Sequence, residues 1–121
     1  MDQRDKRIDE FVELFNSKRF FEAHEVLEDL WIETEGEIKD FYKGLIQCAV
    51  AFVHLERGNY RGAKKLYRTS CQYLNRYPSQ LEGIDVERLL QEFDRFFGEM
   101  VPEAENRGIT MDLETVNTPR I

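Results

Sequence analysis

A nearly unbroken apolar stretch in the middle of the chain most constrains the fold. Residues 45–53 read Leu-Ile-Gln-Cys-Ala-Val-Ala-Phe-Val, so a helix through them is apolar on almost every side. Such a helix must be covered by neighbours in several directions. The whole run is far shorter than the ~20 residues that a membrane-spanning helix needs. The pattern predicts a central helix over residues 37–57 of a globular bundle, with Gly58 as its C-terminal cap.

Four further segments show the spacing of apolar residues that is typical of amphipathic helices. They cover residues 4–16, 20–34, 59–77 and 85–100. Asn59 and Asp85 are suitable N-caps for the last two, and Pro102 lies just beyond the end of the final segment. No segment alternates apolar and polar residues long enough to predict a strand. Short connections make neighbouring helices antiparallel, so we predict an all-α fold, a compact bundle of about five helices built from antiparallel helical hairpins.

The bundle is weakly repeat-like. An aromatic-x-x-Ala pattern opens two of the predicted helices forty residues apart, at Phe20 to Ala23 and at Tyr60 to Ala63. This spacing is typical of repeated helical hairpins, although two independent helix starts also account for it. Residues 1–103 are predicted to form a single domain. Residues 104–121 lack helical periodicity and are predicted to form an extended or frayed C-terminal tail.

Charge and cysteine usage limit the classes of partner. The 121 residues carry a net charge of −7, whereas nucleic-acid binders usually present a basic surface to phosphates. We therefore expect no nucleic-acid partner. No apolar segment follows the charged N-terminus, so neither a signal peptide nor a membrane anchor is expected. Cys48 and Cys71 lie within apolar helical runs and form no Cys-x-x-Cys pair, which suits a reducing compartment. The expected location is the cytoplasm.

One polar cluster interrupts the second predicted helix. His24, Glu28 and Trp31 stand at positions i, i+4 and i+7, which places them on one helix face. A histidine and a carboxylate one turn apart can bind a divalent metal, or the carboxylate can orient the imidazole as a base. The alternative is an ordinary surface pair that contributes only ~0.2–0.5 kcal/mol.

The central helix carries polar residues that can meet this cluster. Lys43 and Gln47 lie one turn apart in its apolar body. An antiparallel hairpin about Gly36 brings Glu28 level with Lys43, and His24 level with Gln47. Buried polar groups need partners, so we predict a buried polar network of these four residues. In this register His54 lies ~10 Å beyond His24 along the helix.

The same residues resemble a known family. The sequence Phe-Glu-Ala-His-Glu-Val-Leu-Glu-Asp-Leu-Trp at 21–31 resembles the signature of a bacterial and archaeal family catalogued as domain of unknown function number 309. The similarity continues through residues 43–52, His54 and residues 58–63. The resemblance implies a compact bundle of helical hairpins. It also implies a metal-binding role for a His-x-x-x-Glu-x-x-aromatic motif, whose three positions His24, Glu28 and Trp31 fill here. It implies no substrate and no partner.

Two functional hypotheses follow. The first is a binding or scaffolding module that contacts another protein or a further copy of the chain, with the His-Glu network as a structural element. The second is a metal-dependent enzyme, of the hydrolase class, in which a divalent metal is bound by His24 and Glu28 and by a third ligand from Glu25 or His54. No residue is assigned a catalytic role. The first hypothesis is favoured, because a catalytic zinc site usually takes three ligands from the protein.

Overall fold

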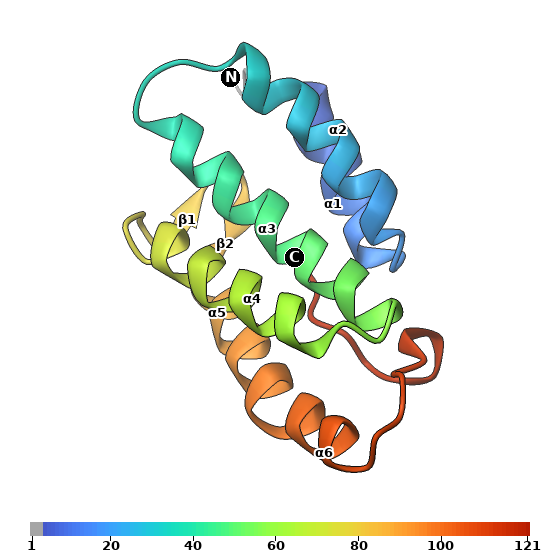
Figure 1. The fold of residues 1–121 in the computed structure, drawn as a ribbon. Coiled ribbons are helices and arrows are strands. Elements are labelled where there is room, and N and C mark those ends of the chain that lie inside the picture. The colour runs from blue at the N-terminus through green and yellow to red at the C-terminus, as the bar shows by residue number, and fades with distance from the viewer. Residues whose placement is uncertain (1–3) are drawn as a thin grey trace.

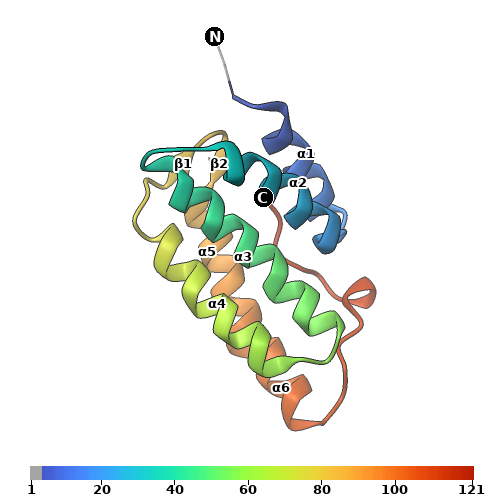
Figure 2. The same cartoon turned by 45° about the horizontal axis from the view of Figure 1, so that its top comes forward.

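Four helices follow one another as antiparallel hairpins in the first part of the chain. The computed structural model describes residues 4–121. Its first helices are α1 (Lys6–Asn16), α2 (Phe20–Glu33), α3 (Ile38–Glu56) and α4 (Tyr60–Leu74). Each packs against the next, and α3 lies between α2 and α4 in two different views (Figures 1 and 2). The predicted all-α bundle of helical hairpins is thereby confirmed.

The second part of the chain begins with a very short β-hairpin and continues as helix. Strands β1 (Gln80–Leu81) and β2 (Ile84–Asp85) pair antiparallel. Helix α5 (Val86–Arg95) then runs through a π-helical turn, η1 (Phe96–Met100), into α6 (Val101–Asn106). A single 3₁₀ turn, η2 (Leu113–Thr115), interrupts the final segment. None of the described helices is long and apolar enough to cross a bilayer.

The core is centred on one phenylalanine of α3. Phe52 has no exposed surface, and its ring stacks on that of Phe20 at a centroid distance of 4.7 Å. Four further phenylalanine rings lie within 6.1 Å of it, from α1, α5 and η1: Phe15, Phe93, Phe96 and Phe97. The apolar stretch that predicted a central helix is therefore the part of the chain on which the other helices converge.

Helices α3 and α4 approach each other closely at Gly44. A Cβ atom on Gly44 would stand only 2.8 Å from Cδ2 of Leu74, so the glycine lets the two helices touch. The buried hydroxyl of Ser70 donates a hydrogen bond to the carbonyl of Gly44 at 2.7 Å. This contact fixes the axial position of α4 relative to α3, and therefore which side chains of the two helices lie next to each other.

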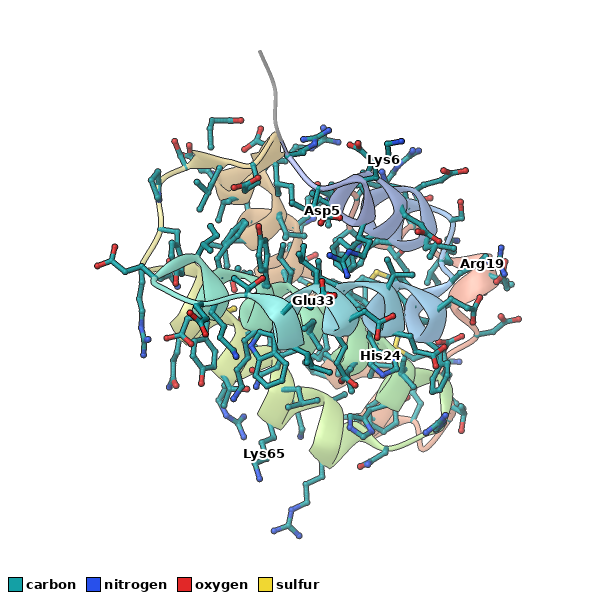
Figure 3. The ribbon with its side chains drawn as sticks, turned by 90° about the horizontal axis from the view of Figure 1, so that it is seen from above. Asp5, Lys6, Arg19, His24, Glu33 and Lys65 are labelled. Carbon is teal, nitrogen blue, oxygen red and sulfur yellow. The ribbon has the colours of Figure 1, made fainter. Side chains whose placement is uncertain are left out.

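Helix caps confirm part of the sequence interpretation. The side chain of Asn59 accepts a hydrogen bond from the amide of Gly62, and that of Asp85 accepts one from Arg88, as predicted. The cap of α1 was not predicted: Asp5 accepts from the amide of Arg7 at 2.8 Å. The Arg7 guanidinium also bonds to the Asp5 carboxylate and lowers the pKa of that group to about 2. Arg7 pairs with Glu33 as well, which joins the start of α1 to the end of α2 (Asp5 and Glu33 are labelled in Figure 3).

The C-terminal segment is packed against the rest of the chain and not frayed, which corrects that alternative of the predicted extended or frayed tail. Helix α6 extends to Asn106, because Pro102 closely follows the π-helical turn η1, where the regular α-helical hydrogen bonding is already interrupted. Beyond it, Met111 and Leu113 are buried. The Lys18 ammonium donates to the carbonyl of Val116 at 2.7 Å. That residues 1–103 form a single domain without residues 104–121 stays a prediction.

Candidate functional site

The three motif residues lie on one face of α2, as their spacing predicted. His24 and Trp31 are half-buried, and Glu28 is exposed. The Nδ1–H group of His24 donates to the backbone carbonyl of Phe21 (His24 is labelled in Figure 3). With the proton on Nδ1, Nε2 carries the free lone pair and is the nitrogen available to a ligand.

The predicted buried network of His24, Glu28, Lys43 and Gln47 is wrong. Glu28 is exposed, and no hydrogen bond or ion pair within residues 4–121 joins it to the other three. The side-chain oxygen of Gln47 instead accepts a hydrogen bond from the Thr69 hydroxyl on α4, at 2.6 Å. These polar side chains stand at the surface, so their hydrogen-bonding groups need no mutual satisfaction.

Exposure, and not the register of the hairpin, explains the difference. Two cations of α3 lie over the ring of Trp31, Lys39 at 4.7 Å and Lys43 at 5.7 Å, so the level of Trp31 falls between them. Lys43 is thus directed to an aromatic ring of α2 and not to the exposed carboxylate of Glu28.

Trp31 sits at the centre of a cluster of rings and cations. The ammonium of Lys39 lies 4.7 Å from its ring centroid, and that of Lys43 contacts both Trp31 and Tyr73 at 5.7 Å. The guanidinium of Arg76 lies 5.1 Å from the ring of Tyr73. The indole N–H of Trp31 is buried and meets no acceptor among the described residues. Trp31 is thus a partly exposed side chain packed on the core, with its ring held by two lysines.

These contacts define one surface that crosses three helices. We call it the motif face, and its central members are Glu28 and Trp31 on α2, Lys43 and Gln47 on α3, and Thr69 and Tyr73 on α4. Only a narrow strip of α3 is accessible there, because α2 and α4 cover it on either side. The motif residues found from sequence therefore line an open surface.

Charge is segregated across the motif face. Residues 20–38, which contain α2, include seven Asp and Glu and no Lys or Arg. Residues 57–81, which contain α4, include six Lys and Arg and no Asp or Glu. The sequence shows the basic run at residues 61–68, but reasoning from the net charge of the whole chain did not set it against an acidic α2. Counting charge helix by helix would have found it.

Metal ligation by His24 and Glu28 stays a prediction. Glu25 is exposed on the same helix, and Nδ1 of His54 lies 3.3 Å from the Asn59 amide nitrogen. Within the described residues, no group of three or more His, Cys, Asp or Glu side chains gathers in a way that could hold a metal ion. A catalytic zinc ion usually takes three ligands from the protein, so a site here would need ligands from elsewhere.

Two cavities lie away from the motif face, beside the C-terminal segment. One, of about 280 Å³, is lined by Phe96, Met100 and Thr118, among others. The second, of about 360 Å³, lies between α6 and the tail and includes Ala104 and Met111. No motif residue lines either cavity.

The two cysteines are poor nucleophiles. Burial raises the pKa of the Cys48 thiol well above its usual value. Burial, together with the nearby carboxylate of Asp94, raises the pKa of Cys71 to about 12. Since the thiolate is the reactive form, neither side chain is suited to nucleophilic catalysis at neutral pH.

The exposure of the motif predicts that its polar residues contribute little to stability. We expect His24→Ala and Glu28→Ala each to change the free energy of unfolding by less than about 1 kcal/mol, as is usual for surface substitutions. Thermal denaturation followed by circular dichroism measures the change. A loss above about 2 kcal/mol in the free energy of unfolding would instead support the structural network, because it is the cost of leaving a buried partner unpaired. Repeating the melts with added Zn²⁺ tests the metal hypothesis, because a bound metal raises the wild-type midpoint and has no such effect on either variant.

Comparison with known proteins assigns part of the chain to a family. Residues 8–66 match the family model described as a domain of unknown function, DUF309. The chain is 39% identical over 87 residues to the uncharacterized protein YpuF of Bacillus subtilis (strain 168), which covers 69% of this chain and 50% of that protein. It is 30% identical over 73 residues to an uncharacterized protein of Aquifex aeolicus (strain VF5), covering 60% of this chain and 22% of the relative. The chain thus spans half or less of either relative. The matched residues hold the entire His24–Glu28–Trp31 motif, and residues 8–66 of this chain belong to the DUF309 family.

Proposed function

We propose that this domain is a protein-interaction module and that the motif face is its binding surface. The observation that carries the proposal is the surface cluster of Trp31, Lys43 and Tyr73. Tryptophan and tyrosine are among the residues that contribute most binding energy at protein interfaces. Their rigid rings bury a large area at a small cost in conformational entropy.

The state of Trp31 also supports a binding role. A buried N–H that lacks an acceptor costs about 1–3 kcal/mol, and the indole N–H of Trp31 lacks one among the described residues. The ring is held by Lys39 and Lys43 while part of it stays exposed. Natural proteins retain such locally unfavourable arrangements mainly at functional sites.

The shape of the surface favours a macromolecule over a small ligand. Small molecules are bound in concave pockets that cover most of their surface. The motif residues line neither of the two cavities beside the C-terminal segment. A broad face formed by three helices, in which α2 and α4 run antiparallel to α3, is suited to binding the surface of another folded protein.

Site-specific photo-crosslinking in the cells that produce the protein tests the proposal. A benzophenone amino acid replaces Gln72, which is exposed on α4 beside Tyr73. We expect a covalent adduct with a defined protein, identified by mass spectrometry, that disappears when Trp31→Ala is added. The matched control carries the same amino acid at Glu13, an exposed position on α1 away from the motif face. No adduct at position 72, equal adducts at both positions, or an adduct that survives Trp31→Ala would each overturn the proposal.

A further inference from the structure

The levels of the side chains across the motif face are fixed by two contacts. Lys43 lies 5.7 Å from both Trp31 and Tyr73, and Lys39 lies 4.7 Å from Trp31, so these side chains share one end of the motif face across α2, α3 and α4. One turn further along α3, Gln47 is hydrogen-bonded to Thr69. Both flanking helices run antiparallel to α3, so each later row of α3 meets an earlier residue of α2 and of α4.

Beyond that end, the α2 edge of the face carries carboxylates and the α4 edge carries cations. Along α2, Glu28 and Glu25 stand three and six residues before Trp31. Along α4, the exposed cations in the same direction are Arg68 and Lys65, five and eight residues before Tyr73 (Lys65 projects into solvent in Figure 3). None of the four forms an ion pair within residues 4–121. The two edges stand about 16–20 Å apart, which is two interhelical spacings, so they cannot pair within one molecule.

We propose that the motif face binds the same face of a second copy of this chain, about a two-fold axis that runs parallel to α3 within the interface. This inference rests on the proposed function, since it names the occupant of the same surface. Rotation about that axis keeps every residue on its own level and exchanges the α2 edge with the α4 edge. Glu25 and Glu28 of one copy then face Lys65 and Arg68 of the other, and the symmetry makes each contact twice.

The charge pattern selects this axis over the perpendicular one. A two-fold axis lying across the helices would set α2 against α2 and α4 against α4, which places like charges together. Juxtaposed like charges disfavour an interface strongly. With the axis parallel to α3, Trp31 of one copy also comes level with Tyr73 of the other. The uncharged side chains of Gln47 and Val50 lie under the axis, and the ammonium of Lys43 is directed aside over the rings of Trp31 and Tyr73.

Charge reversal on the full chain tests the arrangement. The wild type is expected to sediment at twice the chain mass of 14.4 kDa at high concentration, and to dissociate on dilution or added salt. One variant carries Glu25→Lys and Glu28→Lys, and the other carries Lys65→Glu and Arg68→Glu. Each alone should raise the dimer dissociation constant by roughly a hundredfold or more, because like charges then meet at both edges.

Mixing the two variants should restore the dimer. In the mixed pair, both edges again bring opposite charges together, so a heterodimer forms from two chains that do not self-associate. A chain with all four reversals should also form a homodimer, which controls for damage to the fold. A wild type that sediments at the single-chain mass at every concentration, reversed variants that stay dimeric, or a mixture that stays monomeric would each overturn the inference.

The crosslinking experiment separates this inference from the proposed function. An adduct at position 72 with a different protein, together with a monomeric wild type, would contradict the dimer and leave the interaction module standing. An adduct with the chain itself supports both. A dimer in solution that gives no adduct at position 72 would use another surface, and would contradict both.

Discussion

Phe52→Ala is expected to lower the free energy of unfolding by about 3–5 kcal/mol, the usual cost of removing a fully buried phenylalanine side chain. Phe52 has no exposed surface, and five phenylalanine rings from α1, α2, α5 and η1 surround it. Its removal leaves a cavity that rigidly held neighbours cannot fill. Since domains of this size are stable by only about 5–15 kcal/mol, the variant should unfold at a much lower urea concentration.

Phe21→Ala is the matched control for this measurement. Phe21 is also on a helix but is 43% exposed, so the same substitution there should cost less than about 1 kcal/mol. Urea denaturation followed by circular dichroism compares the two midpoints. Similar losses for Phe52 and Phe21 would show that the core is not centred on α3.

Gly44→Ala and Gly98→Ala are expected to change stability in opposite directions. Alanine is favoured over glycine in helices by about 1 kcal/mol. At Gly98 a Cβ atom meets nothing within 4 Å, so the substitution should stabilise the protein by up to that amount. At Gly44 the added carbon would stand 2.8 Å from Leu74 and 3.0 Å from Cβ of Tyr73. Leu74 is fully buried and cannot move aside, so α3 and α4 must separate.

We expect the net effect at Gly44 to be a loss of about 1–3 kcal/mol, as for other overpacked sites. Because the motif face spans α3 and α4, this variant should also weaken any contact made through that face. The melting midpoints of the two glycine variants measure the difference. If Gly44→Ala were as stabilising as Gly98→Ala, the close contact between the helices would be contradicted.

Periodicity predicted the helices because each buries one stripe of side chains. The apolar stretch at 45–53 identified the central helix, and Asn59 and Asp85 marked true helix starts. The C-terminal segment could not be predicted in this way. Its order comes from contacts with distant residues, such as the bond between Lys18 and Val116, and these leave no local pattern.

The candidate site was predicted in part for a similar reason. Helical spacing alone places His24, Glu28 and Trp31 on one face of α2, which the structure confirms. Which side chains of α3 they contact depends on rotamers and exposure, which spacing along one helix does not give: Trp31 meets the cations of Lys39 and Lys43. The predicted network failed because it required burial, whereas these polar groups lie at the surface of the bundle.

The position of Trp31 decides what an optical measurement on this protein reports. It is the only tryptophan in the chain, and it stands on the motif face, whereas the phenylalanines around Phe52 fill the core. Indole emission excited at the red edge of its absorption band therefore reports the local environment of one surface. Occupation of that surface should shift the emission and shield the ring from a soluble quencher even when the backbone signal does not change. Conversely, loosening of the core around Phe52 should first change the circular dichroism of the helices, and only later the emission wavelength of Trp31.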